Sequence, residues 1–305
     1  MPNEQIAILL IHFNRPDLLE KQLKQLFENS CTWDLDIYIA LDGPRSDNAD
    51  DHMARKQIVA HIEKFRQLGL SIFFKAQRKN LGCKKGVECA LDWFFNEVEW
   101  GVVFEDDISF NESTLKYFNI AFKNKVRHLV SGFTPVAADD FWLSQHGTVW
   151  GWGGCSIHWK KYRKMAHIKV STFRSLKTSI SLKEFLVLSQ WVLLIKSNKI
   201  DTWDFKWNLY RRQIGLMTIM PPVNLTCNLG FGSGAHHHGE DVPKWLPIEI
   251  SNVRFSMRGI QNAHYSSKLE RRYFGVKYDE EKYSQLFKGM VLAGFSAVKN
   301  FLKVA

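Results

Sequence analysis

The sequence predicts an α/β protein with a mainly parallel sheet that is covered by helices. Two observations support this prediction. Four strand-like segments alternate with helix-like segments within the first 110 residues, and acidic residues follow directly after two of these strands. Such alternation is typical of parallel strands joined by crossover helices, which bury both faces of the sheet. With 305 residues, the chain is long enough to bury a core of this kind by itself.

The first predicted unit is a strand followed by a helix. Residues 6–13 form a nearly continuous apolar run, as expected for a strand buried on both faces. A turn at residues 14–16 contains a proline, which is favoured at the first position of a helix. The apolar positions after the turn recur at helical spacing: Leu19, Leu23, Leu26 and Phe27.

The second and third predicted strands continue the alternation. Residues 36–41 form a strand that ends at the turn Asp42-Gly43-Pro44, and residues 71–75 form the next strand. Between them lies a polar stretch with apolar residues at helical spacing: Ile58, Val59, Ile62 and Phe65.

The fourth strand, at residues 101–104, follows a further helix. That helix begins after the turn at residues 80–82, and its apolar face comprises Val87, Ala90, Leu91, Phe94 and Phe95. Asp42 and the triplet Glu105-Asp106-Asp107 directly follow their strands. Ligands of parallel sheets collect beyond the carboxyl ends of the strands, so both acidic signals fall at the predicted ligand edge.

The pattern is less regular beyond residue 110. No internal repeat is present, and the recognisable segments are a Trp- and Gly-rich passage at 150–159, a predicted helix at 182–198, an aromatic segment at 202–212, a loop rich in Asn, Gly and His at 221–238, and a predicted terminal helix at about 280–303.

Charge and cysteine content restrict the classes of partner and compartment. A formal net charge of +10 favours anionic partners such as nucleotide diphosphates, lipid headgroups or lipid-linked phosphates. Nucleic acid is not expected, because no nucleic-acid-binding module is recognisable. The five cysteines are odd in number and lack CxxC spacing, which argues against a disulfide framework or a zinc site and favours a reducing compartment.

Membrane insertion and secretion are not expected from the sequence. No segment reaches the roughly 18 consecutive apolar residues of a membrane span. The polar residues 1–4 run directly into the first predicted strand, without the basic and apolar regions of a signal peptide. We therefore expect a cytoplasmic protein that is soluble or peripheral to the membrane.

The triplet at residues 105–107 is the strongest chemical signal. Three consecutive carboxylates at the end of an apolar strand need a counter-charge, and Mg²⁺ or Mn²⁺ supplies one through carboxylate and phosphate oxygens. The alternative is an exposed acidic turn that caps a helix beginning within residues 109–113. From the residues alone, both interpretations stay open.

The triplet resembles the DxD-type motif of GT-A glycosyltransferases, and its Glu-Asp-Asp form resembles that of inverting N-acetylglucosaminyltransferases. A wider resemblance to bacterial nucleotide-sugar transferases covers about residues 6–238. It consists of short motifs in the same order: HFNRP (12–16), LDGPR (41–45), NLGCKKG (80–86), FEDD (104–107), WGWG (150–153), WDFKW (203–207) and NLGFGSGAHH (228–237). Each motif is weak by itself, and their order is more specific.

The resemblance implies a GT-A fold, a Rossmann-like α/β domain with a mainly parallel sheet. Residues 1–239 would form this domain, with a donor half at about 1–110 and an acceptor half at about 111–239. Residues 240–305 would form a helical C-terminal extension. The implied reaction is transfer of a sugar from a nucleotide-diphosphate donor to an acceptor hydroxyl.

The resemblance also assigns residues to the donor and the metal. Asp107 would contact the metal, while Glu105 and Asp106 would face the donor sugar and the ribose. Asn80 and Lys84 would lie near the diphosphate, where an ammonium group offsets phosphate charge without requiring one fixed geometry. The alternative for Asn80 and Lys84 is ordinary solvated surface.

Two further donor-side assignments have simpler alternatives. Asp42 would bond the nucleotide base or the ribose, although Asp also forms turns before Gly-Pro. His237, within the run of histidines at residues 236–238, would lie near the metal or the diphosphate. Ordinary loop histidines are more common, and whether His237 binds metal directly is left open.

Inverting transfer needs a base on the acceptor side, and Asp204 is the candidate. Its aromatic neighbours Trp203 and Phe205 would partly desolvate it and provide a wall for stacking sugars. Its position also matches that of the catalytic Asp expected from the resemblance. The alternatives are that Asp204 caps the following helix, or that the nearby Asp201 is the base.

Indole rings in the Trp- and Gly-rich passage are candidates for the sugar pocket. Trp150 and Trp152 lie beside glycines that permit close backbone approach, and indole faces suit the C–H surfaces of sugars. Core packing uses the same residue types, so we expect a mixed role. Together with Trp203, these residues are the predicted acceptor or sugar pocket.

The terminal helix carries an apolar stripe with lysines nearby. It would lie on a membrane surface, pack back on the domain, or pair in a homodimer. Packing or pairing is favoured over membrane contact. The membrane interpretation gains weight if the acceptor is a lipid-linked saccharide.

The sequence thus predicts a metal-dependent inverting glycosyltransferase of the hexosyltransferase class. UDP-N-acetylglucosamine is the leading donor, Mn²⁺ or Mg²⁺ the cofactor, and a saccharide or lipid-linked saccharide of surface polysaccharide synthesis the acceptor. The alternatives are a retaining transferase, a sugar-1-phosphate nucleotidyltransferase, and a non-catalytic saccharide-binding or membrane scaffold protein. A nucleotidyltransferase needs a glycine-rich basic loop near its N-terminus, whereas residues 11–15 contain no glycine.

Overall fold

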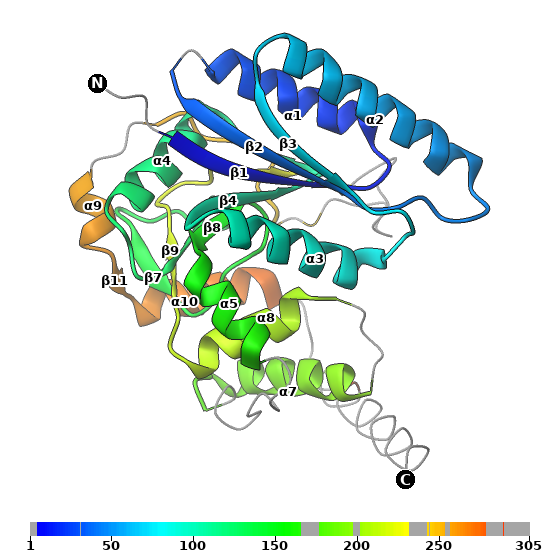
Figure 1. Cartoon of the computed structure of the whole chain (residues 1–305). Coiled ribbons are helices and arrows are strands. Elements are labelled where there is room, and N and C mark those ends of the chain that lie inside the picture. Colours follow the sequence, from blue (N-terminus) through cyan, green and yellow to red (C-terminus); the bar gives the residue numbers. More distant parts are fainter. Residues whose placement is uncertain are drawn as a thin grey trace.

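Figure 1 shows the computed structural model of the chain. It describes residues 5–30, 32–165, 177–197, 202–231, 243, 245–253, 257–278 and 289. The α/β, Rossmann-like fold class predicted from the sequence is confirmed, with a mostly parallel central sheet flanked by helices.

The four predicted strands and the helices between them are present in the first 110 residues. Their bounds are β1 Gln5–His12, α1 Pro16–Asn29, β2 Asp34–Leu41, α2 Ala49–Gln67, β3 Ser71–Ala76, α3 Gly82–Glu97 and β4 Trp100–Glu105. The three connections from β1 to β4 each contain a helix, so all four strands run parallel.

The rest of the chain contributes shorter strands and further helices. These are β5 Ile108–Ser109, α4 Glu112–Lys123, β6 Leu129–Ser131, β7 Trp142–Ser144, β8 Trp152–Cys155, α5 Ser156–Met165, α7 Leu182–Lys196, α8 Asp204–Gln213, β9 Thr218–Met220, β10 Cys227–Asn228, α9 Met257–Gln261, β11 His264–Tyr265 and α10 Ser267–Tyr278. The helix expected near residues 182–198 is α7, and the aromatic segment at 202–212 contains α8.

Nine strands form the main sheet in the order β11-β7-β9-β6-β8-β4-β1-β2-β3. Five neighbouring pairs are parallel, and three, all in the half beyond β4, are antiparallel. The chain builds outward from β1 through β2 to β3 and then returns to place β4 on the other side of β1. The direction of strand addition therefore reverses between β1 and β4, and such a reversal leaves a crevice at the carboxyl ends of the two strands.

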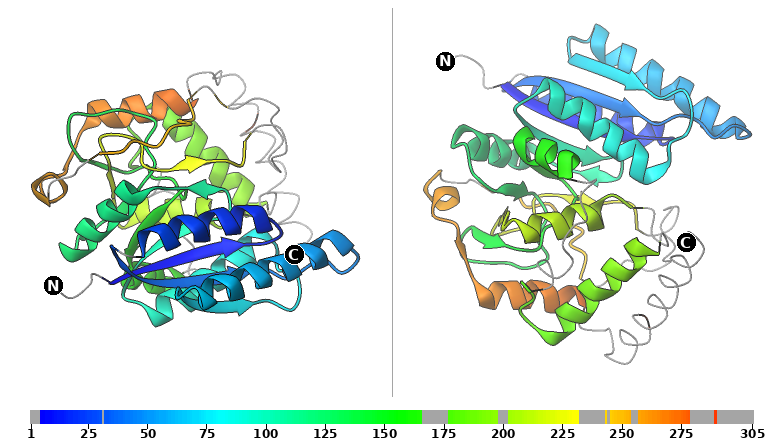
Figure 2. Two further views of the ribbon diagram at one scale, coloured as in Figure 1. Left: turned by 90° about the horizontal axis from the view of Figure 1, so that it is seen from above. Right: turned by 60° about the horizontal axis from the view of Figure 1, so that its bottom comes forward.

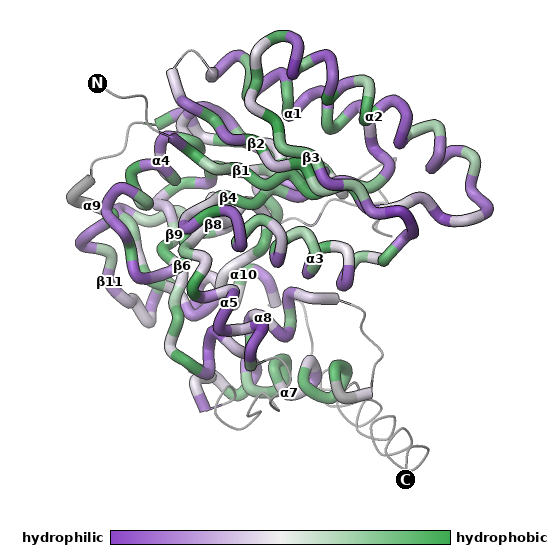
Figure 3. The backbone as a smooth tube through the Cα atoms, viewed as in Figure 1, coloured by the Kyte–Doolittle hydropathy of each residue, from purple (hydrophilic) through white to green (hydrophobic). Residues whose placement is uncertain are grey.

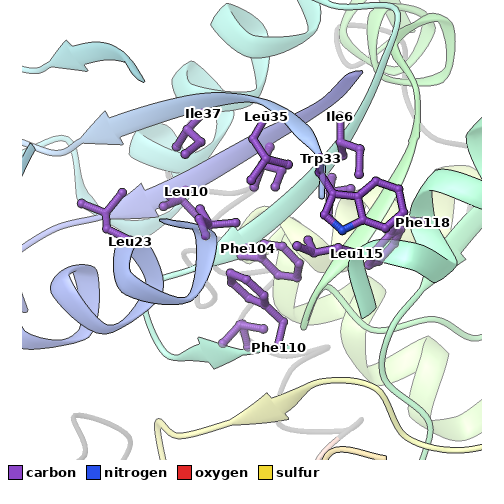
Figure 4. Packing of buried hydrophobic residues seen from close by; sticks show 14 of the residues in the cluster. Ile6, Leu10, Leu23, Trp33, Leu35, Ile37, Phe104, Phe110, Leu115 and Phe118 are labelled. Carbon is purple, nitrogen blue, oxygen red and sulfur yellow. The ribbon is translucent and has the colours of Figure 1, made fainter. Parts of the chain in front are cut away.

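Successive side chains of β1 point to opposite faces of the sheet, so they belong to two separate hydrophobic clusters. Ile6, Ile8 and Leu10 pack with α1, α2 and α4 on one face, whereas Leu9 packs with α3 on the other. Figure 4 shows part of the first cluster, in which Phe104 of β4 stacks on Phe110 at 4.2 Å between ring centroids. Figure 3 shows the central strands mostly in the colours of hydrophobic residues, as expected for a sheet buried on both faces.

The described part of residues 240–305 is attached to the far edge of the sheet. β11 pairs with β7, and Tyr273 of α10 packs against Trp142 of β7 at 6.2 Å between ring centroids. Both views in Figure 2 place α10 at the opposite end of the structure from α1 and α2. The proposed division at residue 239 stays a prediction.

The predicted terminal helix at 280–303 lies outside the described residues, apart from Gly289. Gly289 is helical, and a Cβ atom added to it would lie 2.5 Å from the Gln190 side chain of α7. At this position the chain therefore lies against α7. None of the described helices is both long and apolar enough to pass through a bilayer.

Candidate functional site

A cavity of about 410 Å³ lies at the carboxyl ends of β1, β2 and β4. Its walls come from the turn after β1, the turn after β2, the start of α3 and the acidic turn after β4. This volume falls within the roughly 300–1,000 Å³ range of small-molecule sites. Because the cavity lies where the strand order reverses, the topology itself creates the opening.

The acidic turn after β4 is paired with an arginine from the turn after β1. Arg15 Nη1 lies 3.0 Å from Asp106 Oδ1 and 3.7 Å from Asp107 Oδ2. Burial raises the pKa of Glu105 well above its ordinary value, and the charges of Asp107, Asp106 and Asp204 raise it further. The turn therefore concentrates negative charge, and a guanidinium group offsets part of it.

Gln22 of α1 holds the backbone of the acidic turn. Its amide nitrogen donates to the carbonyl oxygens of Glu105 at 3.0 Å and Ile108 at 2.7 Å. The amide oxygen of Gln22 lies 2.9 Å from His12 Nε2. Because an amide oxygen can only accept a hydrogen bond, His12 Nε2 carries the proton and donates it. Burial is the main cause that lowers the pKa of His12, to about 4, and keeps the ring neutral.

A second strand pair brings the loop after β10 against the acidic turn. β5 and β10 are antiparallel, and Leu229 N donates to Asp107 O at 2.7 Å. A Cβ atom on Gly230 would lie 2.3 Å from Asp107 Oδ2 and 2.9 Å from Asn228 Oδ1, so only glycine permits this approach. The start of the NLGFGSGAHH motif therefore lies beside Asp107.

The acidic turn does not cap the following helix. Asn111 caps α4 instead, because its side chain accepts from Thr114 N at 3.1 Å and Thr114 Oγ1 accepts from Asn111 N at 3.0 Å. The capping interpretation of the triplet is therefore wrong.

A hard divalent cation fits the oxygen donors at the acidic turn. Asp106, Asp107 and Asn228 present carboxylate and carboxamide oxygens, and Mg²⁺ is commonly held by one or two carboxylates together with phosphate and water. Within the described ranges there is no group of three or more His, Cys, Asp or Glu residues suited to a metal. A cation here would therefore take further ligands from a bound phosphate or from water.

Asp42 lines the first cavity and also fastens α3 to the end of β2. Its carboxylate accepts from Leu81 N at 2.9 Å, from Gly82 N at 3.1 Å and from Asn80 Nδ2 at 3.1 Å. A Cβ atom on Gly43 would lie 2.2 Å from the carbonyl carbon of Lys79, so glycine is required there. The predicted contact of Asp42 with a nucleotide stays a prediction.

Asn80 and Lys84 occupy different positions relative to this cavity. Asn80 lines it, whereas Lys84 is not among its lining residues. Lys84 faces Lys206 of α8, and the pKa of Lys206 is lowered by partial burial and then by the positive charge of Lys84. Two ammonium groups thus lie close together between α3 and α8.

Asp204 lies on the wall of a second cavity, of about 290 Å³, between the β7–β8 loop, α7, α8 and α10. Asp204 is the first residue of α8. The N-cap residue of this helix is Trp203, and no side chain forms a capping hydrogen bond there. The hydroxyl of Thr202 donates to its carboxylate. Because its charge contributes to raising the pKa of Glu105, Asp204 lies near the acidic turn as well.

The three predicted pocket tryptophans have different environments. Trp150 lines the second cavity, stacks on Trp245 at 5.9 Å between ring centroids and is half-buried. Trp152 and Trp203 are almost completely buried, pack against each other at 6.1 Å, and line neither of the two larger cavities. The structure gives Trp152 and Trp203 a packing role.

Two predicted site residues lie outside the described residues: His237 and Asp201. Conversely, Arg15, Gln22 and Asn228 lie at the site although no role is predicted for them from the sequence. Arg15 could have been found, because it follows the first strand at the edge where the acidic residues lie. Gln22 carries no such signal, because a glutamine on a helix is usually exposed.

Comparisons with known proteins identify no family. No family model matches the chain, and no curated protein matches it. Among solved structures, it is similar to the mannosyltransferase PcManGT from Pyrobaculum calidifontis, solved with GDP-Man and Mn²⁺, at 10% identity and a TM-score of 0.40. That likeness covers 77% of this chain but only 59% of the mannosyltransferase.

Two further solved structures show a similar degree of likeness. HddC from Yersinia pseudotuberculosis matches at 10% identity and a TM-score of 0.34, over 52% of this chain and 80% of its own. A putative glucose-1-phosphate thymidylyltransferase from Bacillus anthracis, in complex with a sucrose, matches at 11% identity and a TM-score of 0.37. This match covers 76% of this chain and 91% of the thymidylyltransferase chain. At these scores the likenesses decide neither the family nor the activity of this chain.

Proposed function

We propose that this chain is a metal-dependent glycosyltransferase that uses a nucleotide-diphosphate sugar and inverts the configuration at the anomeric carbon. The observation that carries the proposal is the acidic turn of residues 105–107 in a cavity at the carboxyl ends of parallel strands. This is where α/β sheets bind nucleotides, and the acidic oxygens suit the cation that accompanies a diphosphate.

The donor is proposed to bind across the first cavity. Glu105 and Asp106 would face its sugar and ribose, and Asp42 would approach the ribose or the base. Asn80 would lie near the diphosphate, and Lys84 with Lys206 would supply positive charge beside it. A cation held by Asp107 would offset the charge that develops on the departing diphosphate.

Transfer is proposed to be a single displacement. An acceptor hydroxyl oxygen forms a bond to the anomeric carbon while the bond from that carbon to the diphosphate oxygen breaks. The hydroxyl proton passes to Asp204, and the nucleoside diphosphate leaves with the electron pair. Asp204 suits the role of base because it lies on the second cavity, separate from the donor-side wall, yet near Glu105.

The identity of the substrates rests on the resemblance of the motifs. On that basis we propose UDP-N-acetylglucosamine as donor and a saccharide or lipid-linked saccharide as acceptor, in surface polysaccharide synthesis at the cytoplasmic side of a membrane. His237 is proposed as a further contact of the metal or the diphosphate.

The test is binding and turnover of a panel of nucleotide sugars with Mn²⁺, comparing the wild type with Asp107→Asn and Asp204→Asn. We expect metal-dependent binding of one donor, loss of this binding in Asp107→Asn, and retained binding with loss of transfer in Asp204→Asn. Asp47→Asn, on the exposed turn before α2, is the control with the same change of charge.

Other outcomes would redirect the assignment. Release of pyrophosphate from a nucleoside triphosphate and a sugar 1-phosphate would favour a nucleotidyltransferase. A product with the anomeric configuration of the donor would indicate a retaining transferase. Failure of every nucleotide sugar to bind would reject the proposal and leave a non-catalytic saccharide-binding protein as the better interpretation.

A further inference from the structure

The second cavity has walls from four separate parts of the chain. The β7–β8 loop contributes residues 145–150, α7 contributes Trp191, α8 contributes Asp204 and Asn208, and α10 contributes Tyr273. Its volume of about 290 Å³ is at the lower limit for small-molecule sites. The cavity therefore suits the end of a ligand better than a whole nucleotide sugar.

Three polar atoms of residues on the cavity wall are buried without a hydrogen bond within the part of the chain that the structure describes. One is His146 Nε2, which faces the carboxylate of Glu184, and the other two are Gln145 Oε1 and Thr148 Oγ1. Buried polar groups are nearly always bonded, because leaving one unsatisfied costs about 1–3 kcal/mol. Gln145 Oε1 and Thr148 Oγ1 have almost no accessible surface, so a ligand with several hydroxyl groups would bond them after the two side chains rotate toward the cavity.

Aromatic rings form much of the remaining wall. Trp150, Trp191 and Phe205 are half-buried, and Trp191 packs on Phe205 at 4.3 Å between ring centroids. Apolar ring faces beside hydrogen-bonding groups suit a sugar, which presents C–H surfaces on its faces and hydroxyls at its edges.

The positive charges behind the cavity are matched by buried acids. Arg212 Nη2 lies 2.6 Å from Glu184 Oε1, and His146 Nε2 lies 3.2 Å from the same oxygen. Glu270 of α10 accepts from Ser144 Oγ at 2.6 Å and from Gln145 N at 2.9 Å. Lys277, also on the wall, lies over the rings of Trp245 and Tyr278, and Asp204 adds a negative charge to the same wall. Because Arg212 is already paired and Asp204 opposes the charge of Lys277, the cavity favours an uncharged ligand. The bonds of Glu270 also fasten α10 to the loop that carries Gln145 and Thr148.

We propose that the second cavity binds the uncharged terminal sugar of the acceptor saccharide, and that α10 supplies one of its walls. This proposal rests on the proposed function, and it assigns the acceptor site to the β7–β8 loop, α7, α8 and α10. A sugar bound there would bond Gln145 and Thr148, stack on Trp191 or Trp150, and present a hydroxyl to Asp204. The described part of the C-terminal extension would then belong to the binding site.

The test measures binding of neutral and anionic oligosaccharides to the full chain by saturation-transfer NMR, followed by titration calorimetry. Thr148→Val removes only the unpaired hydroxyl and keeps the shape of the side chain. It should therefore unfold at the same or a higher temperature than the wild type, yet bind a neutral saccharide roughly two- to tenfold more weakly. If the role of Thr148 were purely structural, the unfolding temperature and the saccharide affinity would fall together.

Trp191→Ala tests the aromatic wall. We expect it to weaken saccharide binding by about tenfold through loss of stacking, without changing the affinity for a nucleotide sugar. Phe185→Ala is the matched control, because Phe185 lies on the same helix, is 41% exposed and does not line the cavity. It should bind saccharide and nucleotide sugar like the wild type.

The outcomes separate this proposal from the proposed function. Saccharide binding that both cavity variants leave unchanged, preference for anionic saccharides, or no binding of any saccharide by the wild type would each overturn the acceptor site. If no nucleotide sugar binds but a neutral saccharide binds with the expected losses, the proposed function fails and the cavity is still a saccharide site.

Discussion

At the scale of single residues, charge determines the arrangement of the candidate site. Asp106 and Asp107 lie beside each other and near Glu105, which is energetically unfavourable without a cation. Arg15 supplies positive charge at 3.0 Å from Asp106 and 3.7 Å from Asp107. The guanidinium group therefore occupies the side of the acidic turn where a divalent cation would also be attracted, so the two should compete.

We predict that Arg15→Gln increases the affinity of the donor-free protein for Mn²⁺ by about tenfold, because a competing positive charge is removed. The affinity would be measured by titration calorimetry and by the Mn²⁺ paramagnetic resonance signal. Arg45→Gln is the control, since Arg45 also lines the first cavity but pairs with Asp51 at 2.7 Å. Unchanged or weaker Mn²⁺ binding in Arg15→Gln would contradict the competition.

At the scale of elements, α3 shows how one side chain fixes a helix against a strand. The carboxylate of Asp42 accepts from the backbone N–H groups of Leu81 and Gly82, at the N-terminus of α3. The N–H groups at the N-terminus of a helix have no partner within the helix, and these two bonds satisfy two of them. The carboxylate also places a negative charge at the positive end of the helix dipole. The wall of the first cavity therefore depends on Asp42 even without a ligand.

We predict that Asp42→Ala lowers the free energy of unfolding by about 1–2 kcal/mol, the usual cost of losing a helix cap. Asp42→Asn should lose less, because its amide oxygen can still accept one of these bonds. Urea unfolding of both variants, with the exposed Asp47→Ala as reference, measures the difference. Equal stability of Asp42→Ala and the wild type would show that the cap contributes nothing.

The short strand β8 shows which elements escape sequence analysis. Its sequence contains two glycines, which are depleted in strands, and the neighbouring tryptophans favour a sugar pocket over a strand. A Cβ atom on Gly153 would lie 2.8 Å from the carbonyl oxygen of Gly101 and 2.7 Å from the Phe122 ring. The glycine is there because β8 lies tightly against β4 and α4, and this packing is visible only in three dimensions.

At the scale of the whole molecule, the buried pair of His12 and Gln22 connects β1, α1 and the acidic turn. Protonation of His12 would place a charge in the core, where its Nδ1 atom has no acceptor among the described residues. The folded state therefore resists protonation down to a pH of about 4, whereas an unfolded histidine binds a proton near pH 6.5. Between these values the unfolded state holds more protons, so stability falls as the pH falls.

We predict that His12 alone accounts for a loss of up to about 3 kcal/mol of stability between pH 6.5 and pH 4. His12→Gln retains a donor for Gln22 but does not titrate, so its stability should fall less over this range. Unfolding by urea at several pH values measures the difference, and His52→Gln on the exposed side of α2 is the control. If the free energy of unfolding fell equally with pH in the wild type and in His12→Gln, His12 would not be the source of the pH dependence.

The sequence alone determined the class of the fold and the positions of the long elements. Apolar patterns located β1 to β4, α1 to α3 and α7, because each of these elements buries enough apolar surface to leave a regular pattern. It also placed Asp42 and residues 105–107 at one edge of the sheet, because parallel strands end on the same side.

Only the tertiary structure decided what these residues contact. It paired Arg15 with the acidic turn, buried Trp152 and Trp203, and placed Asp204 on a second cavity closed by α10. Such contacts join positions far apart in the chain, such as Ser144 and Glu270, which are separated by 126 residues. Local sequence patterns describe the period of one helix or strand, whereas the packing of elements against one another determines which distant side chains meet.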